Sequence, residues 1–293
     1  MKEWIEAMRL RTLPVSISGV IAGTACAIYH GGFKLLPALI CLVFAIGAQI
    51  TSNFANEYYD YKNGLDKKGR EGFRRGVTEG DISPKAMKKA TFGTLLASIA
   101  IGSILIIWGG WWLVFVGMAV ALFALAYSTG PYPLSHHGLG EVAVIIFFGF
   151  VPVIFTEYVQ TQILLLDSVT ILTAVAVGLM AANVLIVNNY RDVEDDRAVR
   201  KNTSVVILGK RIMSYIYYFN GTVAAIFMSM ASSALPFWVS AGWLSYFAIH
   251  TMIWQKMKIS SGAALNEILK YTSLILFFIT VYLLVIFSCL KPV

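Results

Sequence analysis

The feature that most constrains this chain is a series of long apolar runs that carry no charge. The run from Leu35 to Ala55 contains no lysine, arginine, aspartate or glutamate. A helix rises about 1.5 Å per residue and the hydrocarbon core of a bilayer is about 30 Å thick, so about 20 apolar residues cross it. Hydrophobic residues make up 58% of the 293 residues and charged residues 13%, too little polar surface for a water-soluble domain. The sequence therefore predicts an integral membrane protein.

Nine apolar segments are the candidate transmembrane spans. Only helices and closed barrels satisfy their own backbone in lipid, and the sequence has no alternating strands separated by turns. The fold class is therefore an all-α integral membrane protein, and we expect a single domain over residues 1–293. The expected spans are residues 12–29, 35–55, 91–108, 111–127, 142–160, 169–187, 213–231, 234–253 and 271–289.

The charged residues lie almost entirely on one side of these nine segments. Every lysine and arginine except Lys34 and Lys291 lies in the N-terminus or in the loops 56–90, 128–141, 188–212 and 254–270. The positive-inside rule places that side, with the N-terminus, in the cytoplasm. The net charge of +7 is thus a signal of topology and does not indicate nucleic-acid binding. Most acidic residues lie on the same side of the membrane as the basic ones. Because acids contribute little to topology, the positive-inside rule does not explain why they gather there.

Two acidic clusters follow the second and the sixth apolar segments. At 100° per residue, Asn53, Asn56 and Asp60 fall within about 60° of one another on one helical face. The same spacing, N-x-x-N/D-x-x-x-D, recurs at the same side of the membrane in three further residues: Asn189, Asp192 and Asp196. The recurrence favours two related halves that face each other, each contributing an oxygen-rich helix end.

Carboxylate and amide oxygens without histidine or cysteine suit hard cations such as Mg²⁺. Mg²⁺ in proteins typically uses one or two carboxylates together with substrate phosphates, and basic residues near both clusters fit phosphate oxygens. These residues are Arg9, Arg11, Arg74, Arg75, Arg200 and Lys201. The plain alternative is that each cluster is only a solvated helix end, with the basic residues setting topology.

A membrane enzyme with a phosphate site would act on a lipid diphosphate. Metal ions neutralise a diphosphate leaving group, and the allylic cation left behind needs a dry site with aromatic faces. The aromatic residues placed suitably by sequence are Tyr58, Tyr59, Tyr127 and Phe147, each of which is also a candidate for plain packing.

Across nearly its whole length the chain resembles the UbiA superfamily of membrane prenyltransferases. The branch it most resembles is the 1,4-dihydroxy-2-naphthoate polyprenyltransferases of menaquinone synthesis. The stretches that carry the resemblance are "RLRTLPVSISGVIAGTA", "NEYYDYKNGLD", "GVTEGDIS", "AYSTGPYPLSHHGLGE", "NNYRDVEDDRAVRKNT" and "LNEILKYTSLIL". Two departures concern the first motif: Glu57 stands where many members have aspartate, and Gly64 stands where others place a third aspartate.

The resemblance implies a bundle of nine transmembrane helices with a central cavity open to the cytoplasm, in the bacterial cytoplasmic (inner) membrane. Its implied cofactor is Mg²⁺, and its implied partners are a polyprenyl diphosphate, dihydroxynaphthoate and membrane lipid. The implied metal ligands are Asn56, Asp60, Asp66, Asp192 and Asp196. The residues expected near the substrates are Arg9, Asn53, Arg75, Tyr127, Ser128 and Lys201. Glu141 would lie beside the aromatic acceptor and orient or deprotonate it.

The implied reaction is prenyl transfer to dihydroxynaphthoate with loss of its carboxylate, giving demethylmenaquinone. Another acceptor, such as 4-hydroxybenzoate, homogentisate or a haem, is the main alternative. A transporter would carry ionisable residues at mid-membrane, whereas the spans here hold amides such as Gln49, Asn183 and Asn220. The pattern of phosphatidyl-alcohol transferases is missing.

Overall fold

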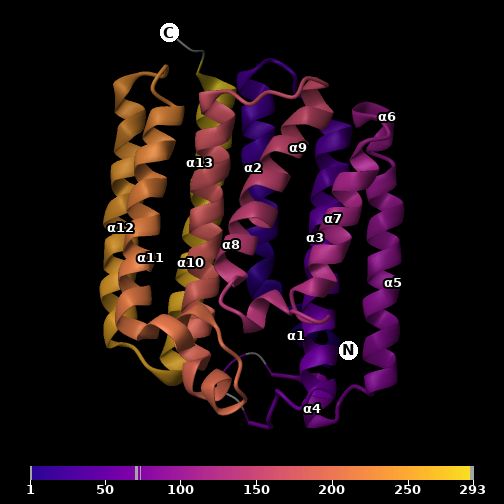
Figure 1. Cartoon of the computed structure of the whole chain (residues 1–293). Coiled ribbons are helices and arrows are strands. Elements are labelled where there is room, and N and C mark those ends of the chain that lie inside the picture. Colours follow the sequence, from indigo (N-terminus) through magenta and orange to yellow (C-terminus); the bar gives the residue numbers. More distant parts are fainter. Residues whose placement is uncertain (1, 70–71, 73, 291–293) are drawn as a thin grey trace.

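The computed structural model describes residues 2–69, 72 and 74–290, which form a bundle of roughly parallel helices (Figure 1). Lys291 lies outside the described residues. The described chain contains no strand, and its one isolated bridge joins His137 to Asn202. The elements in order are α1 (Lys2–Met8), η1 (Leu10–Thr12), α2 (Leu13–Tyr29), α3 (Leu35–Lys62), α4 (Gly76–Glu79), α5 (Pro84–Ser103), α6 (Ile106–Gly109), α7 (Leu113–Ala126), η2 (Leu134–His136), α8 (Gly140–Val144), η3 (Ile145–Phe150), α9 (Val151–Thr161), α10 (Ser168–Ala198), α11 (Ser204–Ala231), η4 (Phe237–Val239), α12 (Ser240–Ile259), η5 (Gly262–Ala264) and α13 (Leu265–Cys289).

Among the described residues, six helical segments are long and apolar enough to cross a bilayer, which makes this a multi-pass membrane protein. They are Lys2–Tyr29, Leu35–Lys62, Pro84–Gly109, Gly140–Thr161, Ser168–Ala198 and Gly262–Cys289. The other three expected spans overlap α7, α11 and α12; α7 is only 14 residues long, and α11 and α12 do not meet the same measure. The expected count of nine spans is therefore not confirmed, and the arrangement in two related halves stays a prediction.

Two helices are longer than the membrane is thick. α3 has 28 residues and α10 has 31, which at 1.5 Å per residue gives lengths of about 42 and 47 Å against a hydrocarbon core of about 30 Å. The ends of both helices therefore extend past the membrane, as the sequence predicts for the second span. These are the ends that carry the two acidic clusters.

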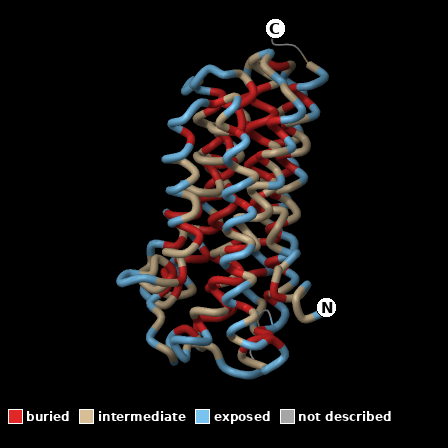
Figure 2. The backbone as a smooth tube through the Cα atoms, turned by 90° about the vertical axis from the view of Figure 1, so that its right-hand side faces the viewer, coloured by how far each residue is buried: buried red, intermediate tan, exposed pale blue. Residues whose placement is uncertain are grey.

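Close helix packing places η3 and α10 side by side in the middle of the bundle. A Cβ added at Gly149 would lie 2.5 Å from the carbonyl oxygen of Ala174 and 2.6 Å from the Cα of Gly178. Small residues allow such backbone approach in membrane bundles. The main apolar core forms around α10, with α2, α11 and α13 packed against it and α12 packed on α11 and α13. In Figure 2 the buried stretches of the backbone are coloured red.

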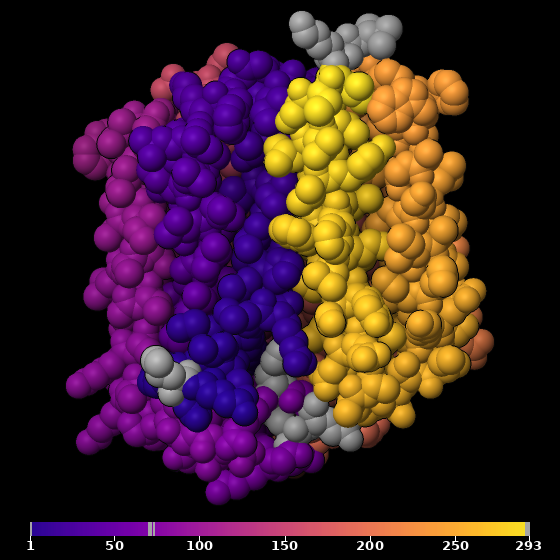
Figure 3. Space-filling view, turned by 180° about the vertical axis from the view of Figure 1, so that it is seen from behind, coloured from indigo at the N-terminus to yellow at the C-terminus, as the bar shows by residue number. Residues whose placement is uncertain are grey.

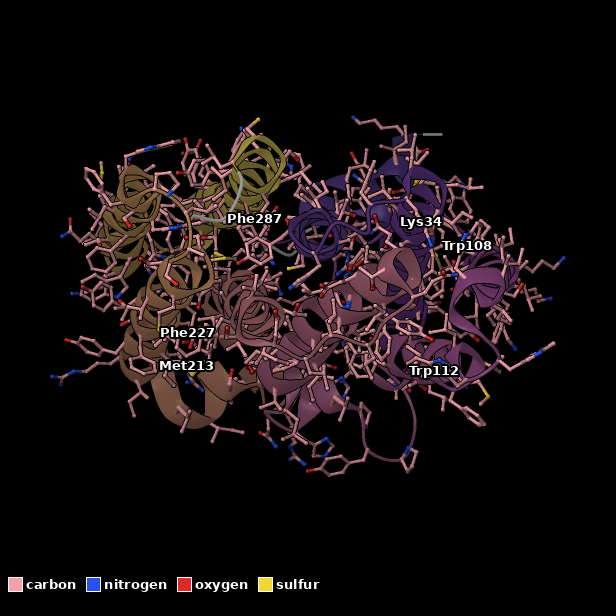
Figure 4. All side chains as sticks on the ribbon, turned by 90° about the horizontal axis from the view of Figure 1, so that it is seen from above. Lys34, Trp108, Trp112, Met213, Phe227 and Phe287 are labelled. Atoms are coloured by element: carbon pink, nitrogen blue, oxygen red, sulfur yellow. The ribbon has the colours of Figure 1, made fainter. Side chains whose placement is uncertain are left out.

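The rear of the bundle is closed by α13, which lies between α2 and α12 (Figure 3). The N-terminus and α4 lie at the end of the bundle that also carries the C-terminal end of α10. The opposite end, viewed in Figure 4, carries Lys34, Trp108 and Trp112 on the side formed by α3 and α5 to α7. Tryptophan is typical of the membrane interface, so this end lies at the other membrane surface.

Candidate active site

A polar pocket of about 140 Å³ lies at the charged end of the bundle, between α3, α10 and the segment after α1. The structure brings most of the predicted site residues to its wall: Arg9, Asn53, Asn56, Arg75, Tyr127, Asp192, Asp196 and Lys201. Four predicted residues do not line this pocket, but each contacts a residue that does. They are Asp60, Asp66, Ser128 and Glu141.

The face of α3 at the pocket is fixed by hydrogen bonds to two other segments. Asn56 Oδ1 accepts a hydrogen bond of 2.8 Å from Arg9 Nη2, and Asn56 Nδ2 donates at 3.0 Å to the hydroxyl of Ser128. Asn53 Nδ2 donates at 2.9 Å to the carbonyl oxygen of Met8. The first acidic motif therefore holds Arg9 and the start of the loop after α7 against one helix face.

Arg75 joins the two acids of the first cluster. Its Nη2 lies 3.3 Å from Asp60 Oδ2, and its Nε lies 3.2 Å from Asp66 Oδ2. The side chains of Asp60 and Asp66 are each 2% exposed. Asp60 Oδ1 is buried and has no hydrogen-bond partner in the described chain, although a buried polar atom without a partner is costly. This oxygen is free to accept a further ligand.

Glu57 does not line the pocket, and it holds the loop that carries Arg75. Its side chain is fully buried, and Oε1 accepts a hydrogen bond of 3.0 Å from the backbone N–H of Val77. Because Val77 follows Arg75 by two residues, this contact fixes where the guanidinium lies. Sequence reasoning placed Glu57 in the first motif without this role.

The second acidic cluster contains an arginine that the sequence analysis missed. Arg191, whose side chain is 1% exposed, forms a fork with Asp192: Nε lies 2.7 Å from Oδ1 and Nη2 lies 2.8 Å from Oδ2. Nη2 also donates to Asn188 Oδ1 at 2.9 Å, and Nη1 donates to Asn266 Oδ1, on α13, at 2.8 Å. In the sequence, Arg191 could have been found from its spacing to Asn188 and Asp192, because the three residues share one helical face.

The end of α10 places Lys201 beside Asp196. Arg200 adopts a left-handed conformation with φ 57°, and the backbone N–H of Lys201 donates at 2.9 Å to the carbonyl oxygen of Asp196. This reversal closes the helix in the manner of a C-terminal cap. It leaves Lys201 Nζ 3.8 Å from Asp196 Oδ1, so the lysine and the acid both line the pocket.

Glu141 lies behind the pocket wall at the start of α8. It accepts a hydrogen bond of 3.2 Å from Nδ2 of Asn189, a pocket residue, and another from the hydroxyl of Ser204. In the loop before α8, burial and the positive charge of Lys201 lower the pKa of His136 from its ordinary value. His136 is therefore a neutral imidazole close to the site at pH 7.

The donor set of the pocket fits a hard divalent cation. Its acids and amides supply oxygen ligands, which Mg²⁺ prefers, and Asp60 offers an unpartnered oxygen. In the part of the chain that the structure describes, no three histidine, cysteine, aspartate or glutamate side chains converge on one metal point. Such a site suits Mg²⁺ that takes part of its coordination from substrate phosphates.

The pocket adjoins a larger apolar chamber of about 260 Å³, and the two share Gln49, Ser52, Phe123 and Phe148 in their walls. A charged head site joined to an apolar chamber inside a membrane bundle is the arrangement of an enzyme for amphiphilic substrates. The chain belongs to the UbiA prenyltransferase family, whose model matches residues 16–274. It is a membrane prenyltransferase.

Named relatives and solved structures agree with this family. The chain is 38% identical over 214 residues to a 1,4-dihydroxy-2-naphthoate octaprenyltransferase of Escherichia coli, covering 71% of this chain and 68% of the relative. It is 34% identical over 237 residues to a protein of the same name from Mycobacterium tuberculosis, covering 81% and 80%. A UbiA homologue from Archaeoglobus fulgidus bound to GPP and Mg²⁺ has the same fold, with a TM-score of 0.69, 15% identity and coverage of 98% and 99%.

Proposed function

We propose that this protein transfers a polyprenyl group from a polyprenyl diphosphate to 1,4-dihydroxy-2-naphthoate, with loss of the acceptor carboxylate, in menaquinone biosynthesis. The observation that carries the proposal is the polar pocket, lined by Arg9, Arg75, Asp192 and Lys201, which shares part of its wall with an apolar chamber. This pairing suits a substrate with an anionic head and an apolar tail. The names of the E. coli and M. tuberculosis relatives support the naphthoate acceptor.

The basic residues of the pocket bind the diphosphate. Arg9, Arg75 and Lys201 lie on three different segments around one cavity, so their charges converge where the phosphates sit. Arginine forks bind phosphate oxygens in pairs. Asn56, Asp60, Asp66, Asp192 and Asp196 would hold Mg²⁺, which, when bound, neutralises the diphosphate and stabilises the oxygen that leaves the prenyl carbon. The bound Mg²⁺ and GPP named for the A. fulgidus homologue support this assignment.

The acceptor side is formed by Glu141 with its two hydrogen-bond donors, Asn189 and Ser204. We assign Glu141 to orient the naphthoate and to accept a proton from its hydroxyl as the ring attacks the prenyl carbon. Tyr127 lines the pocket beside Phe123, and its ring lies 5.9 Å from that of Phe123. These aromatic faces exclude water from the carbon that becomes positive.

The protein works in the bacterial cytoplasmic membrane, with its N-terminus and polar pocket on the cytoplasmic side. The support for this orientation is the charge distribution, since Lys34 and Lys291 are the exceptions among the basic residues of the sequence. The surrounding membrane lipid contacts the outer faces of its helices, and the polyprenyl diphosphate reaches the protein from this lipid. The net positive charge of the chain is explained by this topology, so we propose no nucleic-acid partner.

The test is prenyl transfer by the purified protein with and without Mg²⁺. Dihydroxynaphthoate and 4-hydroxybenzoate are offered in parallel with octaprenyl diphosphate, and both product and released diphosphate are measured. We expect Mg²⁺-dependent product from the naphthoate alone. Product from 4-hydroxybenzoate alone would overturn the acceptor but keep the diphosphate site. No diphosphate release with either acceptor would overturn the proposed activity.

A further inference from the structure

The polar pocket and the apolar chamber share one wall, and that wall carries a polar side chain that the proposed chemistry does not yet use. The chamber lies between α2, α3, α5, α7 and α9, and the shared wall consists of Gln49, Ser52, Phe123 and Phe148. A prenyl diphosphate with its head in the pocket and its tail in the chamber would place its reacting carbon at this wall. Gln49 is therefore a polar group close to the reaction.

Gln49 extends the face of α3 that carries the first acidic motif. At 100° per residue it falls on the same helical face as Asn53, Asn56 and Asp60. At 1.5 Å per residue it lies about 6 Å farther from the charged end than Asn53. The helix therefore presents this amide to the pocket at a greater depth than the proposed metal ligands.

A relay of hydrogen bonds fixes which end of the Gln49 amide is free. Asn53 Nδ2 donates at 2.9 Å to the carbonyl oxygen of Met8, so Asn53 Oδ1 is left as an acceptor. Gln49 Nε2 donates to that oxygen at 3.3 Å. Gln49 Oε1 is buried and has no hydrogen-bond partner in the described chain. The free atom at the shared wall is therefore an acceptor that lacks a donor.

The substrates of the proposed reaction differ in what they can offer this oxygen. A buried amide oxygen without a donor is costly, so we expect a bound group to supply one. The diphosphate oxygens accept hydrogen bonds, and the prenyl tail has no polar hydrogen. Dihydroxynaphthoate carries hydroxyl groups, which donate. The aromatic acceptor is thus the substrate that can satisfy Gln49.

Of the acceptor's hydroxyl groups, the 4-hydroxyl is the better donor to the protein. In 1,4-dihydroxy-2-naphthoate the 1-hydroxyl lies next to the carboxylate and donates to it within the molecule. The 4-hydroxyl lies on the opposite side of the ring and has no neighbouring acceptor. With the 4-hydroxyl at Gln49 on α3, the edge of the ring with the 1-hydroxyl faces α10, where Asn189 lines the pocket and contacts Glu141.

We propose that Gln49 Oε1 accepts a hydrogen bond from the 4-hydroxyl of the acceptor and so holds the ring at the shared wall, next to the prenyl carbon. This inference rests on the proposed function, since it takes dihydroxynaphthoate as the acceptor and places the prenyl tail in the chamber. Gln49 binds the acceptor and takes part in no covalent step. Its loss should therefore weaken acceptor binding and leave prenyl diphosphate binding unchanged.

The experiment compares Gln49→Leu with the wild type in the purified protein, with Mg²⁺ and octaprenyl diphosphate. Leucine is close to glutamine in size and has no amide oxygen. We expect the KM for dihydroxynaphthoate to rise at least about tenfold, as for loss of a hydrogen bond to a buried group, and the KM for the prenyl diphosphate to stay within about twofold. Gln49→Met keeps an unbranched side chain and should give the same result.

Gln255→Leu is the matched control, because it makes the same change on the exposed side of α12 and lines neither cavity. It should behave as wild type. The second probe is 1-hydroxy-2-naphthoate, which lacks the 4-hydroxyl, measured as a competitive inhibitor against dihydroxynaphthoate. Its Ki should stay within about threefold between wild type and Gln49→Leu, because the hydrogen bond that the variant lacks is one that this molecule cannot form.

A Ki for 1-hydroxy-2-naphthoate that rises as much as the KM for dihydroxynaphthoate would overturn the proposal and indicate a general distortion of the wall. An unchanged KM for dihydroxynaphthoate would also overturn it, and would mean that water alone satisfies the Gln49 oxygen. A rise confined to the KM for the prenyl diphosphate would assign Gln49 to the other substrate. Failure of the wild type to form product from dihydroxynaphthoate would instead overturn the proposed function, so the two failures are distinguishable.

Discussion

The two ends of the bundle hold clusters of ionisable groups in opposite ways. At the end away from the pocket, His30 joins two acids: Nδ1 lies 2.6 Å from Glu157 Oε1, and Nε2 lies 2.8 Å from Asp167 Oδ2. The other oxygens of these acids accept hydrogen bonds from Thr170, at 2.7 Å from its hydroxyl to Glu157 and 2.9 Å from its N–H to Asp167. Every oxygen and ring nitrogen of this cluster has a partner.

The pocket end leaves buried polar atoms without partners in the described chain. They are Asp60 Oδ1, Glu57 Oε2, Gln49 Oε1 and Arg75 Nη1. An unsatisfied buried group costs about 1–3 kcal/mol, which a structure tolerates where another molecule supplies the missing partner. The His30 cluster therefore serves the fold, whereas the pocket is complete only with its ligands. Substitutions at the two ends should therefore affect different measurements.

The largest effect should come from Asp192→Asn. The change removes a charge next to the pocket while the residue keeps its size, so we expect turnover to fall at least about a hundredfold, as for loss of one group that stabilises developing charge. Glu194→Gln is the control, because the Glu194 side chain is 75% exposed and pairs with Arg197 on the surface. Prenyl transfer by the purified variants is the measurement, and near-normal activity of Asp192→Asn would remove this aspartate from the site.

A smaller but substantial loss should follow Arg191→Lys. Lysine keeps the charge but cannot reproduce the fork that contacts Asp192, Asn188 and Asn266 together. Loss of a group that orients a ligand typically costs about 10–100-fold in activity or metal affinity. The apparent Mg²⁺ affinity should weaken together with turnover. An unchanged Mg²⁺ dependence would mean that Arg191 only stabilises the buried carboxylate; the exposed Arg197, replaced by lysine, serves as the control.

Glu57→Ala should act on substrate binding more than on chemistry. Without the acceptor for the Val77 N–H, the loop no longer holds Arg75 against Asp60, so we expect KM for the prenyl diphosphate to rise about tenfold with kcat changed less. Glu57→Gln keeps an oxygen that can accept from Val77 and should restore most of the affinity. A fall in kcat alone, with KM unchanged, would contradict a positioning role.

Much of the fold and of the candidate site could be predicted from the sequence, whereas the other features depend on tertiary contacts. Uncharged runs specify membrane helices, and helical spacing predicts Asn53, Asn56 and Asp60 on one face. In the structure Asn53 and Asn56 both line the pocket. One contact that holds the Arg191 guanidinium is with Asn266, 75 residues away along the chain, and sequence spacing does not reveal such a contact. The count of nine spans stays a prediction, because α7 has only 14 residues and α11 and α12 fall short of the length and hydropathy measure that six segments of the described chain meet. The chamber is likewise a product of packing between five segments.

The smallest effect on activity should come from the end opposite the pocket, at His30. Burial alone would lower its pKa, but the hydrogen bonds and charges of Asp167 and Glu157 outweigh burial and raise the pKa above its ordinary value. For Asp167, burial would raise the pKa, but the Thr170 N–H and His30 outweigh it and lower the pKa. His30→Gln should leave prenyl transfer within about twofold, because the change lies outside the pocket.

The signs of these shifts define a pH window for stability. A raised histidine pKa contributes stability that is fully present below about pH 6.5 and is lost as pH rises through the folded-state pKa. A lowered aspartate pKa contributes stability that is present above about pH 3.9 and is lost as pH falls through the folded-state value. The cluster therefore stabilises the protein most between about pH 4 and 6.5, and the wild type should melt at a higher temperature in detergent at pH 6 than at pH 8.5. His30→Gln should flatten that difference; an identical pH profile in the variant would show that the cluster does not link pH to stability.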